Sequence, residues 1–229
     1  MPRVRSPAMR RADPARRWRR TRTGLLLTSI GLFVLWLPLV AALGALFLSF
    51  GSTFFFLGAR AAGRRHEVSV AVAFLLLSIG GIMTAVFFGA FLLEASYGAS
   101  RGYSLRILEE PARRLLWDTV PGTLALSAGI AVQVHELVPD RRRLLYSLAG
   151  LLAGTAIAAT WLAEPELAFL DDRPVRGGSV LEFLLRLSAY RLLEAPAYLG
   201  LAAVHLRAFL ALEDSSAPVP RVAAADPPT

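Results

Sequence analysis

The chain has 229 residues, of which 55% are hydrophobic and 18% are charged, and its formal net charge is +8. Soluble domains have about 45–50% apolar and about 25% charged residues, so this composition, gathered in long apolar runs, is typical of an integral membrane protein. Cysteine and lysine are absent, which excludes disulfides, thiolate metal sites, cysteine nucleophiles, lysine Schiff bases and phosphate-binding P-loops.

Residues 1–23 form a basic segment that is rich in Arg, Pro and Ala, and we expect it to be disordered. Residues 1–22 hold nine arginines and one acid, Asp13. Such a tail can bind nucleic acid or anionic lipid. Arginines directly before the first apolar segment are, however, typical of the cytoplasmic end of a membrane protein. We therefore expect a cytoplasmic N-terminus and no nucleic-acid partner.

Residues 24–58 are almost wholly apolar. A straight helix of this stretch would be about 52 Å long, against a hydrocarbon core of about 30 Å. Because proline disfavours helix at the residue before it, we expect a tight hairpin: 24–37, a turn at Pro38, and 39–58. One kinked helix is the alternative. A cleaved signal peptide is disfavoured, because the apolar run continues well beyond its first arm.

The remaining chain alternates apolar and polar segments. Spans are expected at 68–93, 120–138, 144–163 and 190–212, with an outer polar stretch at 94–119, an outer loop at 164–179 and a disordered tail at 213–229. Within the polar stretch, 103–117 has leucines among charges, which indicates an interfacial helix broken at Pro111. The last helical stretch, 180–212, is too long for one straight span, so its first part is expected at the interface.

These segments predict an all-α fold, a membrane bundle of about six transmembrane helices over residues 24–212, with both termini cytoplasmic. The loops at 60–65 and 141–143 each pack three arginines beside a span. The positive-inside rule places such loops in the cytoplasm. If residues 24–58 crossed only once, both loops would fall outside, which the rule disfavours.

Small residues recur at four-residue spacing on three of the expected spans. Gly81, Ala85 and Gly89 share one helix face, Gly150 and Gly154 share another, and Ala125 and Gly129 repeat the pattern. Small residues let helix backbones approach closely in lipid. We favour packing within one bundle over a dedicated oligomer interface.

Ionisable residues at membrane depth are costly and often functional. His135, Glu136, Arg191 and Glu194 are the candidates for a polar path between the spans at 120–138 and 190–212. Arg191 and Glu194 can pair on one helix face, and Pro196 is expected to kink the helix beside them. The favoured interpretation is that this pair neutralises itself near the interface.

Three histidines, His66, His135 and His205, are all expected toward the cytoplasmic side, on different helices. Histidines with a nearby carboxylate can bind zinc, iron or haem. No two of them are spaced as a metal motif, so we expect no metal and no cofactor. Residues 98–102 match G-x-S-x-G, but a hydrolase needs this serine on a strand-to-helix turn within reach of a histidine, which disfavours a catalytic role.

The N-terminal hairpin carries a resemblance. It combines Trp36-Leu37-Pro38, Gly44 and Gly51 with a basic turn from Gly58 to His66. This pattern resembles multi-pass membrane proteins of archaea whose activity is uncharacterised, so the resemblance implies origin and topology only. The absence of lysine and asparagine, which have AT-rich codons, likewise indicates a GC-rich, prokaryotic genome.

No motif specifies a reaction or substrate. The sequence favours a non-enzymatic multi-pass component of the cell membrane, in contact with the lipid bilayer and with a partner subunit or a second copy of itself as a homo-oligomer. One alternative is a small transporter or channel that uses the polar path. The other is a membrane metal- or haem-binding protein that uses the three histidines.

Overall fold

The computed structural model describes residues 14–37, 40–59 and 64–215. The described residues form an all-α fold, as expected. The helices are α1 (Pro14–Leu35), α2 (Ala41–Gly58), α3 (Arg64–Arg101), α4 (Glu109–Trp117), α5 (Val120–Val134), α6 (Arg142–Ala163), α7 (Gly177–Tyr190) and α8 (Ala195–Ser215). Short 3-10 helices at Leu105–Leu108, Pro139–Arg141, Glu164–Phe169 and Arg191–Glu194 connect them.

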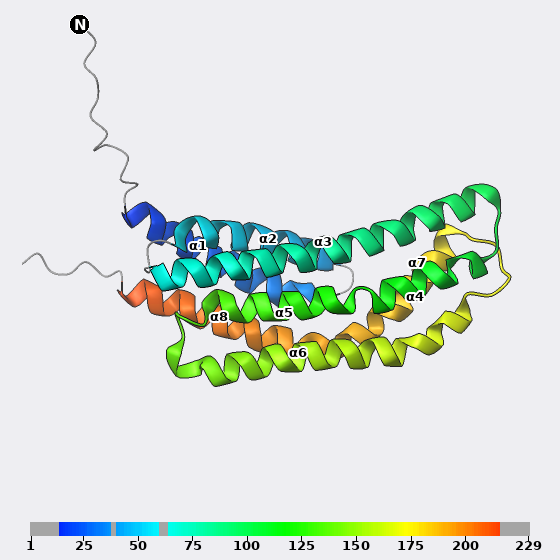
Figure 1. Ribbon diagram of the computed structural model, residues 1–229. Coiled ribbons are helices and arrows are strands. Elements are labelled where there is room, and N and C mark those ends of the chain that lie inside the picture. The colour runs from blue at the N-terminus through cyan, green and yellow to red at the C-terminus, as the bar shows by residue number, and fades with distance from the viewer. Residues whose placement is uncertain (1–13, 38–39, 60–63, 216–229) are drawn as a thin grey trace, which may run out of the picture.

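The helices form an elongated bundle in which α3 runs the full length (Figure 1). Along one half, α3 packs against α5 and α2, while α1 packs against α2 and α8, and α6 against α5 and α8. Along the other half, α3 is accompanied by α4, α7 and the segment after α6. The beginning of α1 and the end of α8 lie at the same end of the molecule, which we call the inner end; the outer end carries α4 and α7.

Five helical segments of the described chain are long and apolar enough to cross a membrane by length and composition. They are Ala41–Gly58, Arg64–Arg101, Leu105–Val134, Pro139–Phe169 and Gly177–Leu212. The sixth expected span corresponds to α1, which lies outside this set because arginines occupy its first half.

α1 and α2 form the expected antiparallel hairpin, and glycines set its spacing. A Cβ added to Gly31 would lie 2.6 Å from the backbone nitrogen of Leu48, and one on Gly51 would lie 2.5 Å from that of Thr28. The two backbones therefore touch, as small residues permit. Pro38, where we expected the turn, lies outside the described residues.

The expected disorder of residues 1–23 is wrong for the part from residue 14 onward, because α1 begins at Pro14. Proline is favoured at the first helical position, and the arginines and alanine that follow are good helix formers. Thr21 is fully buried against Gly58 of α2, so tertiary contact also holds this basic turn in the helix. Residues 1–13 lie outside the described part, as does most of the expected C-terminal tail; α8 continues to Ser215.

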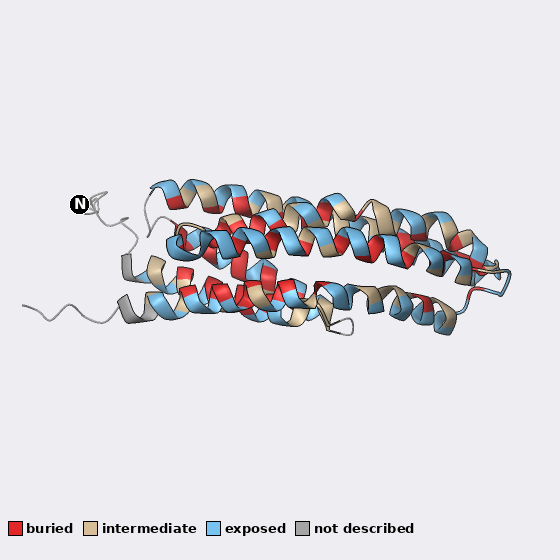
Figure 2. Ribbon diagram, turned by 90° about the horizontal axis from the view of Figure 1, so that it is seen from below, coloured by how far each residue is buried: buried red, intermediate tan, exposed pale blue. Residues whose placement is uncertain are grey.

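The inner half contains one hydrophobic core, built where one face of each helix meets its neighbours (Figure 2). On α3 the buried residues Val70, Ala73, Leu77 and Gly80 recur every three or four positions, which is the period of one helix face. α5 packs closely on this face, since a Cβ on Gly129 would lie 2.9 Å from the Leu77 side chain.

The outer half contains a second, separate core, which we call the cap core. Its buried members are Phe91, Ala95, Leu105, Leu108, Ala112, Leu167, Leu170, Val175 and Phe183. The helix expected within 103–117 is present. The outer loop expected at 164–179 is wrong in part, because Glu164–Phe169 is a 3-10 helix and α7 begins at Gly177. The two segments pack on each other. The backbone N–H of Leu105 donates to Arg173 O at 2.7 Å, and that of Val175 donates to Tyr103 O at 2.8 Å.

Two expected helix interruptions have different outcomes. α4 continues through Pro111, because proline is tolerated in the first turn, where its missing N–H has no intrahelical partner. The break lies instead between Trp117 and Val120. The kink expected at Pro196 lies slightly earlier: α7 ends at Tyr190, and a 3-10 turn over Arg191–Glu194 precedes α8, whose second residue is Pro196.

Candidate functional site

The inner end holds a polar cluster where α5 ends and α6 begins. His135 Nε2 lies 2.9 Å from Glu136 Oε1, and Arg142 Nη2 lies 3.0 Å from Glu136 Oε2. Arg142 Nε also donates to the backbone oxygen of His135 at 3.0 Å. Both carboxylate oxygens of Glu136 therefore have a partner. Arg142 neutralises the carboxylate and links the end of α5 to the beginning of α6.

The other two histidines lie inside the bundle. His66 is 2% exposed and packs edge-on against Phe55, with ring centroids 5.3 Å apart. His205 is fully buried, and its Nδ1 lies 2.9 Å from Leu201 O. Among the described residues, no group of three or more His, Asp or Glu side chains is arranged to hold a metal ion. The three histidines therefore do not form the common ligand set that the metal or haem alternative requires.

Arg191 and Glu194 lie at the opposite end of α8 from the inner cluster. Glu194 is buried and Arg191 is exposed, in the turn that precedes α8. α8 then runs to the inner end over roughly 30 Å of helix. Because His135 and Glu136 lie at that inner end, the four residues do not converge on one place between α5 and α8. This distribution is not the cavity that the polar-path interpretation requires.

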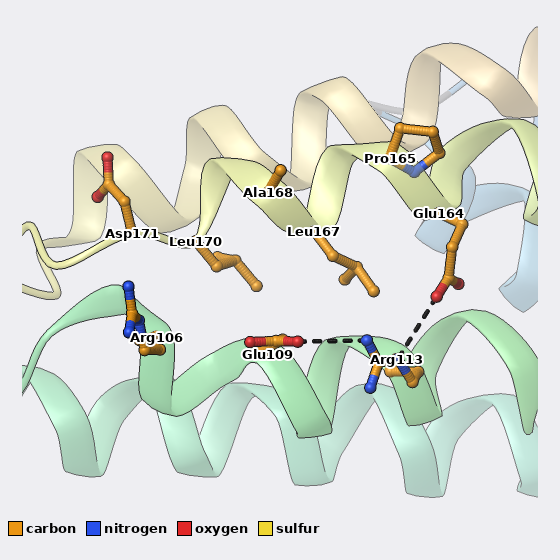
Figure 3. Close-up of a pocket in the computed structure, with 9 residues that line it drawn as sticks. All are labelled: Arg106, Glu109, Arg113, Glu164, Pro165, Leu167, Ala168, Leu170 and Asp171. Carbon is orange, nitrogen blue, oxygen red and sulfur yellow. Dashed lines mark hydrogen bonds and ion pairs between the residues drawn. The ribbon is translucent and has the colours of Figure 1, made fainter.

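The outer end has an open groove of about 440 Å³ between α4 and the Glu164–Phe169 helix (Figure 3). Pro165, Leu167, Ala168 and Leu170 line it on the side of the Glu164–Phe169 helix. Arg113 joins the two sides, because it lies 3.2 Å from Glu109 Oε1 on its own helix and 3.4 Å from Glu164 Oε1 across the groove. A ligand in the groove would have to displace these ion pairs. We therefore interpret them as structural contacts that hold α4 and the Glu164–Phe169 helix together over the cap core.

Further polar contacts hold the cap together. Trp117 Nε1 donates to Glu164 Oε2 at 2.7 Å, and the Tyr190 hydroxyl donates to Glu166 Oε1 at 2.9 Å. At the tip, the backbone N–H and the guanidinium of Arg173 donate to Asp171, which holds the pKa of that carboxyl below its usual value. Sequence reasoning missed the contacts of Glu164 and Glu166 because their partners are far apart along the chain.

Five of the small residues that we singled out for packing face outward. A Cβ added to Gly81, Gly89, Gly150 or Gly154 would have nothing within 4 Å, and Ala85 is exposed. The expected packing of these five residues within the bundle is therefore wrong. Gly129, which repeats the pattern on α5, does pack as expected, and it and Gly80 make the close contacts of α3 and α5, because the partner helices lie on those faces.

The G-x-S-x-G match also has a structural explanation. Its serine, Ser100, donates to the backbone oxygen of Tyr97 on the same helix. Gly102 has a φ of 69°, the left-handed conformation that commonly ends helices and favours glycine. The motif thus marks the end of α3.

Comparison with protein-family models, with curated proteins and with solved structures gives no match.

Proposed function

We propose that this chain is an integral membrane protein that crosses the bilayer six times, with both termini cytoplasmic, and that it is a non-enzymatic component that assembles with a second copy of itself. The bilayer part of the proposal is supported by five apolar helices and by the arginines at the inner end. α1 provides the sixth crossing as the partner of α2. The even number of crossings is consistent with the beginning of α1 and the end of α8 both lying at the inner end.

The topology is testable because the chain has no native cysteine. In intact cells, Ser100→Cys is expected to react with a membrane-impermeant maleimide, since Ser100 is exposed at the outer end. Asp140→Cys, exposed in the inner turn between α5 and α6, is expected to react only after permeabilisation. Labelling of position 140 in intact cells, with protection of position 100, would invert the proposed orientation.

The assembly part of the proposal depends on one outward face of α3. This face, which we call the assembly face, consists of Gly81, Ala85, Gly89, Leu92 and Ser96, which recur every three or four positions. A Cβ added to Gly81 or Gly89 would meet nothing within 4 Å, and Ala85, Leu92 and Ser96 are exposed. The face carries no charge, and its small residues allow two identical helices to approach closely around a two-fold axis.

The length of α3 gives this face a reason to be covered. α3 has 38 residues, and about 20 residues cross a hydrocarbon core. The expected span ends at residue 93, and α3 continues past it to Arg101. Leu92 and Leu93, at this end of the span, are 39% and 73% exposed, and apolar surface that meets water there would cost roughly 25 cal/mol per Å². A second copy docked along α3 would bury them.

Cross-linking tests this assembly. Ala85→Cys is expected to form a disulfide-linked dimer on oxidation in native membranes. Ala158→Cys, exposed on α6, is the matched control and is expected to remain monomeric. Gly81→Leu with Gly89→Leu should abolish the dimer without destabilising the monomer, since a Cβ at either position meets nothing within 4 Å.

The reciprocal control is Gly150→Leu with Gly154→Leu, because these glycines are equally open on α6. This pair should leave the dimer intact. A dimer that survives substitution on α3 and is lost on substitution of α6 would reject the assembly face. A monomer in all cases, by cross-linking and by mass measurement in detergent, would reject self-association altogether.

A further inference from the structure

The arginines at the two ends of the molecule differ in their partners. At the outer end, Arg106, Arg113, Arg114, Arg173 and Arg186 each form an ion pair with a carboxylate. At the inner end, Arg64 and Arg65 have no carboxylate within ion-pair range in the described part of the chain. Protein carboxylates thus neutralise much of the outer basic charge and leave these inner guanidinium groups available to an external anion.

Arg64 and Arg65 line a groove of about 570 Å³ together with Val68, Ser69 and Glu136. The groove lies where α3 begins and α5 ends. Glu136 does not neutralise the two arginines, because its oxygens are engaged by His135 and Arg142. The volume is within the usual range for small-molecule sites, about 300–1,000 Å³. The groove therefore combines free positive charge with enough space for a charged headgroup.

The position of the groove indicates what kind of anion it would take. Val68, on its edge, is 57% exposed, and the next turn of α3 exposes Val72 at 45%. The groove thus opens onto the apolar surface of α3, at the level where hydrocarbon would meet the inner headgroups. A free phosphate ion would use only the arginines. A phospholipid would use both the arginines and the adjoining apolar surface.

We propose that this groove binds the phosphate headgroup of an anionic phospholipid of the inner leaflet. Arg64 and Arg65 contact the phosphate, and Val68 and Val72 contact the first part of an acyl chain. Basic pockets beside transmembrane helices on the cytoplasmic side recognise anionic headgroups by this combination of charge and apolar contact.

The test is a titration of the purified full-length protein, in neutral detergent, with phosphatidylglycerol, phosphatidylcholine or inorganic phosphate, followed by thermal unfolding. Phosphatidylglycerol is expected to raise the unfolding temperature, and the other two are not. Arg64→Gln with Arg65→Gln should raise the phosphatidylglycerol concentration needed for half the effect by about 30-fold, because each arginine near an anionic lipid surface contributes roughly a factor of five.

The matched control is Arg141→Gln with Arg143→Gln. It removes the same charge from exposed inner positions outside the groove and should leave the titration nearly unchanged. Ser69→Glu keeps both arginines but adds an anion to the groove, and it should weaken the response to phosphatidylglycerol. Equal losses in the two double variants, an equal response to phosphatidylcholine, or full stabilisation by inorganic phosphate would each overturn the lipid site.

Discussion

Gly31→Ala is expected to destabilise the protein by about 3 kcal/mol, at the upper end of the usual range for inserting a group into a packed site. The added methyl would lie 2.6 Å from the backbone nitrogen of Leu48 and 2.8 Å from the backbone oxygen of Gly44. These atoms belong to the α2 backbone and cannot rotate away as a side chain can. The two helices would therefore have to separate, and the contacts along the whole hairpin would loosen together.

The same substitution at an open position provides the control. Gly154→Ala on α6 meets nothing within 4 Å, and alanine is favoured over glycine inside a helix by about 1 kcal/mol. This variant should be as stable as the parent or slightly more so. Unfolding by denaturing detergent, followed by circular dichroism, measures both variants. Equal stability of Gly31→Ala and Gly154→Ala would contradict the close contact of α1 and α2.

The contrast between packed glycines such as Gly31 and open glycines such as Gly154 shows how far the sequence predicts packing. Length, hydropathy and the positions of prolines were sufficient to predict an all-α chain, the hairpin arms and an interruption of the helix near Pro196. They did not show which small residues pack, because Gly81 and Gly129 have similar neighbours along the chain. Only the position of the partner helix distinguishes them, and that position depends on long-range contacts.

The cap was missed for a related physical reason. Charged residues such as Glu109 and Arg113 dominate its segments, so the sequence predicts an interfacial helix at 103–117 and a loop at 164–179 without predicting that they pack together. Their apolar residues are few and lie far apart in sequence, so no single segment has enough buried surface to be stable alone. Stability arises only when residues 103–106 pair with 171–175 and cover the end of α3.

Phe183→Ala is the substitution that we expect to affect the cap most. Phe183 is fully buried and packs against Phe91, with ring centroids 6.0 Å apart. Removing a buried phenylalanine side chain typically costs about 3–5 kcal/mol. Because the cap core is separate from the inner core, the loss should appear as local opening of the outer end while the inner half stays folded.

Amide hydrogen exchange distinguishes local opening from global unfolding. In Phe183→Ala, the amides of Leu105 and Val175, which bond the two cap segments, should exchange at least about 100-fold faster, as a loss of 3 kcal/mol implies. Amides in the middle of α5 should be unaffected. Leu185→Ala, on the same helix but 44% exposed, should change neither region. Parallel acceleration in α5 would mean that the two cores unfold as one unit, and the cap would then be an extension of the bundle with no independent stability.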